Sequence, residues 1–414
     1  TSTGSIIRDD ATQHWTGKAR SPSNGKWPNE HWGRHKYVTG PDGQEDEAEL
    51  YEWPWGAGAA ADRALALQWD LAHQLVDRVP VFLDTRFWIW AREAAFDDVV
   101  DEKLISFLGA LRLAVQSGRA FFPVTADLIE EFSKQTPECF AQTMHLVDHL
   151  SLGVALVPVS ERNAIEIEAL LAQSHPAHPP VPRPVWTKAV FAFGYEDLRP
   201  KGVEISDRVL IELTERAWQA KPSEVAATYP TGVFDARGES ERLAVFLKEQ
   251  ECLHEHEIDT YATAVRYEVA GATSMITGIA AREFRRLAGA YGKLQLAEDI
   301  EASRKFGRET GRIMSLALQQ DENRRKFPSL YIQAALHAAV RYRKGQVIKP
   351  NDLFDFRHAA AALPHCKAFF TESKLRSLIT SGHMRLDTLY GCKVMHTVEE
   401  ATAWLGDLVI DGAG

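Results

Sequence analysis

Acidic side chains far apart in the chain could together hold a divalent metal ion. The stretch from 351 to 375, NDLFDFRHAAAALPHCKAFFTESKL, carries Asp352 and Asp355 three residues apart and Glu372 after an apolar run. Asp84 ends another apolar run, PVFL. Mg²⁺ and Mn²⁺ prefer carboxylate oxygens as ligands, and such ions can activate a water molecule at a phosphodiester. These residue types therefore indicate metal-dependent hydrolysis, without a nucleophile from the protein.

A helix and a strand must position these acids. The run from Ala359 to Ala362 favours helix, Pro364 is expected to stop it, and the apolar residues 368–370 suit a short buried strand. Polar residues just past the carboxyl end of a strand line the ligand crevice of an open α/β sheet. The order of acid, helix, strand and acid therefore predicts a site at that edge of a sheet.

The same stretch resembles the PIN-like nuclease family, in particular bacterial PIN-like proteins. In these chains an Asp opens a helix rich in small residues, and a strand that ends in Thr follows it. The residues that carry the resemblance are Asn351, Asp352, Asp355, His358, Leu363, Pro364, Phe370, Thr371 and Glu372. Two positions depart from the family pattern, because Lys367 stands where an acid is common and Glu372 where Asp is usual. The resemblance spans roughly 81 to 172 and 327 to 410.

The resemblance implies a set of catalytic and metal-binding acids. These are Asp84, Glu130, Asp355 and Glu372, with Asp352 as a further metal ligand. Glu130 is preferred because it lies five residues after Thr125, the offset at which family members place the acid of their second helix. Glu131 would point about 100° away, so only one of the two can face the site. Two alternatives stay open: Asp84 as the cap of the next helix, and the two glutamates as a solvated surface pair.

The function implied is that of an endonuclease that uses Mg²⁺ or Mn²⁺ and cleaves RNA in preference to DNA. Thr371, Arg357 and Lys374 are the residues expected to hold substrate phosphates. An alternative is a catalytically inactive PIN-like scaffold that binds RNA or regulates a partner through its helical insertion, and Glu372 and Lys367 favour it. A phosphatase with the same acids would differ in its substrate alone.

The expected fold is α/β, with a parallel sheet flanked by helices. Apolar runs near residues 81, 121, 153, 368 and 392 are mostly followed by helices, which agrees with the five-stranded sheet of PIN-like proteins. The ranges expected are an N-terminal extension (1–78), the first half of the PIN-like core (79–175), a proline-rich linker (176–204), an all-helical insertion (205–326) and the second half of the core (327–414).

Composition bounds the partners and the location. The chain has 414 residues and a net charge of −10, yet 281–349 holds 15 Lys and Arg against 7 Asp and Glu. Such a basic zone either draws phosphates toward an acidic site or is a solvated helical face. Four cysteines without CxxC spacing, no secretory signal and no long apolar run predict a cytoplasmic protein outside the membrane. PIN-like proteins often dimerise, so the resemblance also implies a homodimer.

Overall fold

The computed structural model describes residues 58–97, 101–174, 183–194, 204–228, 241–242, 245, 258–343 and 348–411. Thr1–Tyr51 and Glu52–Gly414 are two compact units, and every described residue belongs to the second. Most of the predicted N-terminal extension, 1–57, therefore lies outside the described residues. Its last part forms the helix α1 (Ala59–Gln74).

Four short strands form a parallel sheet at the centre of this unit. They run in the order β2-β1-β5-β6, and Leu83 at the end of β1 lies beside Phe370 at the end of β5. All of the strands that the structure describes are β1 (Val79–Leu83), β2 (Ala120–Phe121), β3 (Val154–Leu156), β4 (Trp186–Lys188), β5 (Ala368–Phe370) and β6 (Lys393–Met395). The molecule is thus a mixed α/β protein that is mostly helical.

The fifth strand expected in this sheet pairs elsewhere. β3 forms an antiparallel pair with β4, and a single parallel bridge between Val124 and Ala155 connects it to the segment after β2. Pro123 precedes that bridge and has no N–H to donate to a strand ladder. The parallel sheet therefore has four strands, and β3 and β4 form a separate sheet of two.

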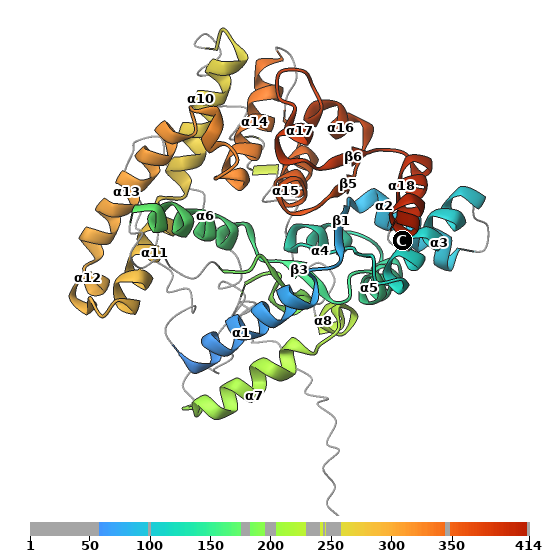
Figure 1. The fold of residues 1–414 in the computed structure, drawn as a ribbon, viewed down its shortest axis with the longest axis horizontal. Helices are drawn as coiled ribbons and strands as arrows, with labels where there is room; N and C mark the ends of the chain where they lie inside the picture. The colour runs from blue at the N-terminus through green and yellow to red at the C-terminus, as the bar shows by residue number, and fades with distance from the viewer. Residues whose placement is uncertain are drawn as a thin grey trace, which may run out of the picture. The chain divides into compact units, whose positions relative to one another are not determined.

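Helices cover both faces of the parallel sheet. The helices that the structure describes are α1 (Ala59–Gln74), α2 (Thr85–Phe96), α3 (Glu102–Gln116), α4 (Ala126–Phe132), α5 (Pro137–Leu150), α6 (Val159–Ser174), α7 (Asp207–Trp218), α8 (Pro222–Thr228), α10 (Tyr261–Met275), α11 (Thr277–Ala290), α12 (Leu294–Glu298), α13 (Ile300–Ala317), α14 (Pro328–Tyr342), α15 (Pro350–His365), α16 (Ser373–Ile379), α17 (Leu386–Tyr390) and α18 (Val398–Asp411). Figure 1 shows α2, α3 and α18 on one side of β1 and β5, and α14 and α15 on the other.

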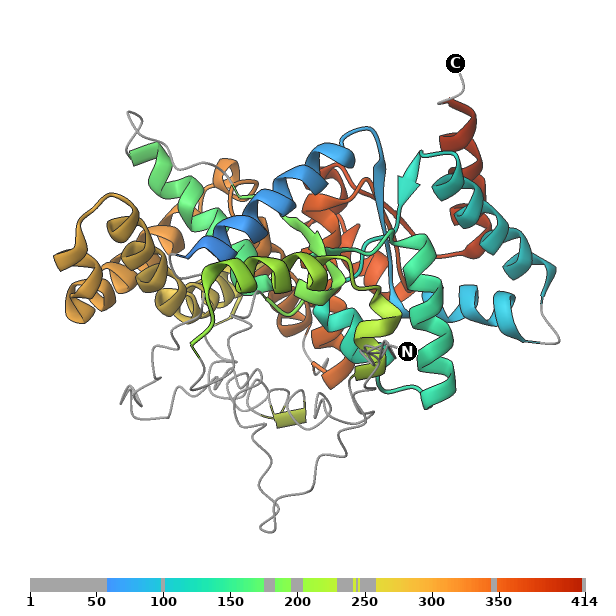
Figure 2. The same ribbon diagram turned by 90° about the horizontal axis from the view of Figure 1, so that it is seen from below.

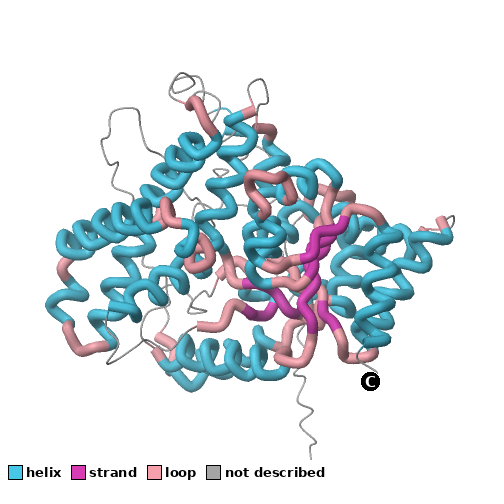
Figure 3. Tube along the Cα trace, turned by 45° about the horizontal axis from the view of Figure 1, so that its top comes forward, coloured by secondary structure: helices cyan, strands magenta, loops and turns pink. Residues whose placement is uncertain are grey.

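Two neighbouring phenylalanines of β5 account for these layers. The Phe370 ring packs against Phe87 of α2 and Trp404 of α18, whereas the Phe369 ring packs against Phe82. Phe82 in turn lies against His358 of α15. Because successive side chains of a strand point to opposite faces, one strand joins both helical layers. The strands lie between the helices, as Figure 3 shows.

Local sequence explains where the helices begin. Asp84, Thr125 and Thr136 accept hydrogen bonds from the first backbone N–H groups of α2, α4 and α5. Proline occupies the first turn of α5, α14 and α15, where its missing N–H costs nothing. α15 ends at His365, one residue past Pro364, because a proline in the last turn leaves the preceding turns in place.

The predicted linker contains ordered structure. Within 176–204, residues 183–194 include β4 and the 3₁₀ helix η2 (Ala189–Phe191), and Trp186 packs edge-on against Phe121. The proline-rich residues 175–182 lie outside the described residues. The described residues of the predicted helical insertion form helices joined by short turns, and α11, α12 and α13 lie together on the side of α6 away from α3 and α18 (Figures 1 and 2).

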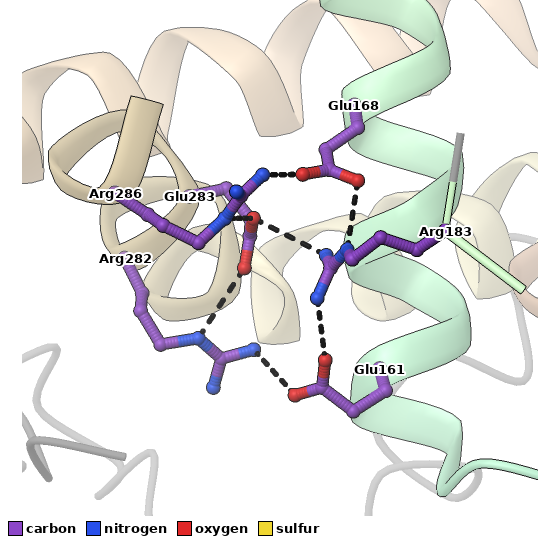
Figure 4. A network of polar contacts seen from close by, with 6 residues as sticks. All are labelled: Glu161, Glu168, Arg183, Arg282, Glu283 and Arg286. Atoms are coloured by element: carbon purple, nitrogen blue, oxygen red, sulfur yellow. Dashed lines mark hydrogen bonds and ion pairs between the residues drawn. The ribbon is translucent and has the colours of Figure 1, made fainter. Parts of the chain in front are cut away.

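A network of buried ion pairs joins α6 to α11. Arg183 lies at its centre, with its guanidinium 2.8 Å from both Glu161 and Glu168 of α6 and 3.3 Å from Glu283 of α11. Arg282 and Arg286 of α11 complete the network (Figure 4). Three arginines balance three glutamates, so the network is a structural junction between the insertion and the core.

Two expectations from composition, on the cysteines and on membrane spans, can be compared with the described residues. Cys139, Cys366 and Cys392 are free thiols, whereas Cys252 lies outside the described residues. Among the helices that the structure describes, none is both long and apolar enough to cross a membrane.

Candidate metal centre

Asp84 lies at the carboxyl edge of the sheet, directly after β1. Its carboxylate is almost fully buried and accepts three hydrogen bonds, from the Thr85 N–H at 2.8 Å, the Thr371 hydroxyl at 2.7 Å and His358 Nδ1 at 3.0 Å. Asp84 therefore caps α2 and also belongs to a polar cluster. The sequence left open whether Asp84 is a helix cap or part of a site, and the structure gives it both positions. Parallel pairing of β1 with β5 brings Thr371 to it, because both residues follow their strands.

α15 contributes the facing residues. Asp355 and His358 are three residues apart, which places them on one face of the helix. Asp84, Asp355 and His358 each offer one ligand atom, and these atoms lie within 4.8 Å of one another. This buried group could hold a metal ion. It is the sole such group of three or more His, Cys, Asp or Glu in the described part of the chain.

Glu131 of α4 is the fourth polar residue of the cluster. Its carboxylate accepts a hydrogen bond from the Thr85 hydroxyl and lies 3.8 Å from His358 Nε2. The prediction chose Glu130 instead. Adjacent residues on a helix point about 100° apart, so only one of the two can face this cluster, and the contacts identify Glu131.

Burial and charge set the protonation states. Burial would lower the pKa of His358, but the hydrogen bond with Asp84 and the charges of Glu131 and Asp84 raise it to about 9. Burial would raise the pKa of Asp84, and the hydrogen bonds from His358, Thr371 and Thr85 with the charge of His358 hold it below its usual value. Asp84 is therefore a carboxylate and His358 an imidazolium at neutral pH.

Asp355 behaves in the opposite way. Burial, followed by the charge of Asp84, raises the pKa of Asp355 to about 8, although His358 partly offsets this. At neutral pH the residue therefore carries a proton as long as no cation replaces it. A buried carboxyl group that must be neutral beside a second carboxylate is the arrangement that a divalent ion would stabilise.

The cluster lies at the point where the strand order reverses. The chain moves from β1 to β2 on one side of the sheet, and β5 and β6 lie on the other. In open α/β sheets this switch point opens a crevice at the carboxyl ends of the two central strands. Asp84 and Thr371 follow β1 and β5 directly, so topology alone brings the cluster to the position where ligands bind.

Several predicted residues have other roles. Glu372 is half exposed, lies 3.7 Å from Arg86 and does not belong to the compact group. Asp352 accepts a hydrogen bond from the Lys349 N–H at 2.9 Å and one from Lys374 at 2.5 Å, so it caps α15 and pairs with Lys374. Neither carboxylate joins Asp84 and Asp355, because each projects from the first turn of its helix toward another partner.

The residues predicted to bind phosphate also differ from expectation. Thr371 is fully buried and donates its hydroxyl to Asp84, so it holds the cluster and does not reach a substrate. Arg357 lies 3.1 Å from Asp127, and Lys374 lies against Asp352. Part of the basic zone is also occupied, since Arg282 and Arg286 belong to the junction with α6.

The chain was compared with protein-family models, with curated proteins and with solved structures, and none of the three comparisons found a match. The function therefore has to be inferred from the chain's own residues. Sequence reasoning named Asp84 and Asp355 but assigned no role to His358. The signal was present in the spacing of Asp355 and His358, which fits one helical face.

Proposed function

We propose that the protein is a divalent-metal-dependent nuclease whose metal is held by Asp84, Asp355 and His358. The observation that carries this proposal is their convergence at the switch point of the sheet, with the Asp355 carboxyl group buried and protonated next to a carboxylate. A protein gains nothing in stability from such a pair. A cation that displaces the proton of Asp355 would remove the repulsion.

The two carboxylates fit Mg²⁺ or Mn²⁺. The imidazole nitrogen of His358 is a better ligand for a transition ion than for Mg²⁺, so Mn²⁺ is the ion proposed. Asp84 Oδ1 and His358 Nδ1 are 3.0 Å apart, and ligands about 2.1 Å from one ion in octahedral geometry are separated by about 3 Å. When bound, the ion activates a water molecule and neutralises charge at the scissile phosphate. This separation also suits the hydrogen bond that the two residues make without an ion.

The chain's own residues supply the position of the ligands. The Thr85 N–H and the Thr371 hydroxyl hold both oxygens of Asp84, so its carboxylate has one orientation. The Thr85 hydroxyl holds Glu131, which completes the link from α2 to α4. Glu131 then lies close enough to His358 for its carboxylate to balance the positive charge of the imidazolium, or to contact a water molecule in the site.

The proposal also includes a family, the PIN-like nucleases, and a substrate, RNA. The order β2-β1-β5-β6, with acids after β1 and on the helix before β5, supports the resemblance to PIN-like nucleases. That resemblance favours RNA over DNA. The alternative of an inactive scaffold is supported by the hydrogen bonds of Asp84, which are complete without a metal, and by the outward position of Glu372.

The test is cleavage of labelled single-stranded RNA and DNA of one sequence with Mn²⁺, with Mg²⁺ and with EDTA. The expected result is cutting that requires the metal and is lost in Asp84→Asn and Asp355→Asn. Neighbouring substitutions give the matched control: Glu131→Gln should lower the rate about tenfold or more, and Glu130→Gln should not. If the folded protein cuts neither the RNA nor the DNA with either ion, the nuclease proposal fails, and a catalytically inactive scaffold becomes the better explanation.

A further inference from the structure

An arginine that sequence reasoning did not consider lies beside the metal centre. Arg86 is two residues after Asp84 in the first turn of α2, and its side chain is 52% exposed. Its guanidinium lies over the ring of Trp90 one turn later, 4.6 Å from the ring centroid. Trp90 is itself fixed by an edge contact with the buried ring of Phe87, 4.9 Å away. The contact with Trp90 therefore holds the arginine in place while half of its side chain stays exposed to solvent.

The ion pair of Arg86 is easily displaced. Glu372 is 3.7 Å away and 51% exposed, and exposed pairs of this kind are worth about 1 kcal/mol or less. Glu372 follows Thr371, and Thr371 donates to Asp84. Arg86 is thus two residues from Asp84, and Glu372 is one residue from the threonine that holds Asp84, so the pair is adjacent in sequence to the candidate metal ligands.

Other cations near the centre are less suited to an incoming anion. Arg357 has a side chain only 27% exposed and lies 3.1 Å from Asp127, which is itself mostly buried. The Nζ of Lys374 lies 2.5 Å from a buried carboxylate, that of Asp352. Freeing either cation would leave a buried or partly buried acid without its partner, at a high cost. Arg86 would leave only the exposed Glu372.

We infer that Arg86, stacked on Trp90, binds a backbone phosphate of single-stranded nucleic acid and positions the strand over the metal centre. The inference rests on the proposed nuclease function. A planar guanidinium offers paired N–H groups to phosphate oxygens, and a preordered side chain loses less entropy when it binds. Trp90 provides that order.

The preference for a single strand follows from the depth of the centre. Asp84 is 3% exposed, so a strand has to bend sharply to bring a scissile phosphate toward it. A single strand can bend in this way, whereas a duplex resists bending over so short a length. Aromatic and arginine surfaces also serve single strands, because each base presents a face that can stack.

Glu372 then has a role other than metal binding. It is the counter-ion of Arg86 in the free protein and is released when phosphate arrives. Removal of its charge should strengthen binding, because the carboxylate competes with the phosphate for the same guanidinium. A metal ligand would behave differently, since its loss would leave affinity for the strand unchanged in EDTA and would abolish cleavage.

The experiment measures binding of a fluorescent single-stranded oligonucleotide by anisotropy, with the full chain, in EDTA and over a series of salt concentrations. Arg86→Gln is expected to bind about five- to tenfold more weakly and to lower the slope of log Kd against log salt by about one. Glu372→Gln is expected to bind about two- to fivefold more tightly.

Arg385→Gln is the matched control. Arg385 is 59% exposed and lies 3.8 Å from Asp387, so its own exposure and its ion-pair distance are close to those of Arg86. Equal affinities for Arg86→Gln, Arg385→Gln and wild type would overturn the inference, as would a wild-type protein that binds no strand or binds a duplex more tightly. Metal-dependent cleavage is measured separately. If Asp355→Asn still showed metal-dependent cleavage, the assigned metal site would be refuted. If Arg86→Gln also bound the strand more weakly, the role of Arg86 in phosphate binding would still stand.

Discussion

At the level of single residues, stability and metal binding make opposite demands on Asp355. Its pKa is raised to about 8 by burial and then by Asp84, whereas an unfolded chain would ionise it near 3.8. Between these values the folded protein binds the extra proton, so the free energy of unfolding falls as pH rises from about 4 to about 8. The residue therefore costs stability at the pH at which it would bind a metal.

Asp355→Asn should remove this cost. In EDTA at pH 8 the variant is expected to be more stable than wild type by up to about 5 kcal/mol, because the amide is neutral at every pH. Urea unfolding at pH 5 and pH 8 measures the difference, which should shrink at pH 5. A variant that is less stable than wild type at pH 8 would contradict the assignment of Asp355 as a buried, repelled carboxyl group.

At the level of elements, α6 and α11 are held together by charge. Arg183→Met would leave Glu161, Glu168 and Glu283 without their shared partner, and the expected loss is about 3 to 5 kcal/mol. Thermal and urea unfolding measure it. Arg63→Met is the control, because the pair of Arg63 with Glu215 is well exposed and should contribute less than about 1 kcal/mol. Equal effects would show that the network does not stabilise this junction.

α13 crosses its neighbours at two glycines one turn apart. A Cβ on Gly307 would overlap the carbonyl oxygen of Thr277, and one on Gly311 would lie 2.8 Å from that of Thr273. Neither oxygen can move without its helix, so Gly307→Ala should destabilise the protein by about 1 to 3 kcal/mol.

Gly271→Ala of α10 is the opposite case. No atom lies within 4 Å of the added Cβ, so the alanine should stabilise the helix by about 0.5 to 1 kcal/mol. Urea unfolding of the two variants side by side checks both signs. A destabilised Gly271→Ala or a neutral Gly307→Ala would show that the helices pack differently.

At the level of the whole molecule, metal binding, protonation and stability are linked. Asp355 and His358, with pKa values of about 8 and about 9, must each lose a proton before they can bind an ion. The affinity for Mn²⁺ should therefore rise by up to about tenfold per pH unit for each proton released between pH 6 and pH 8. Because an ion that binds the folded state alone raises Tm, the Tm shift at fixed Mn²⁺ should grow over this range.

Differential scanning fluorimetry with and without Mn²⁺ at several pH values gives this shift. Asp355→Asn should show almost none of it, since the variant lacks one of the three ligands. A shift in wild type that does not depend on pH would mean that the ion binds elsewhere or displaces no proton.

The sequence by itself predicted the positions of β1, β2, β3, β5 and β6, but not β4, together with the two central acids and their edge of the sheet. Asp84 follows a short apolar run and Asp355 lies in the helix before another, and these are local patterns of period and composition. Parallel pairing of β1 with β5 then makes their meeting a consequence of topology. Even His358 could have been found, since it lies three residues from Asp355 on the same helix.

Only the tertiary structure decided which polar side chains join them. Glu130 and Glu131 are equivalent in the sequence, and the rotation of α4 against α2 selected Glu131 through its contact with Thr85. Glu372 lies half exposed beside Arg86 of another element and outside the compact group. β3 pairs with β4, which lies in the expected linker, and one bridge connects β3 to the segment after β2. Each outcome depends on contacts between residues distant in sequence, which local patterns do not encode.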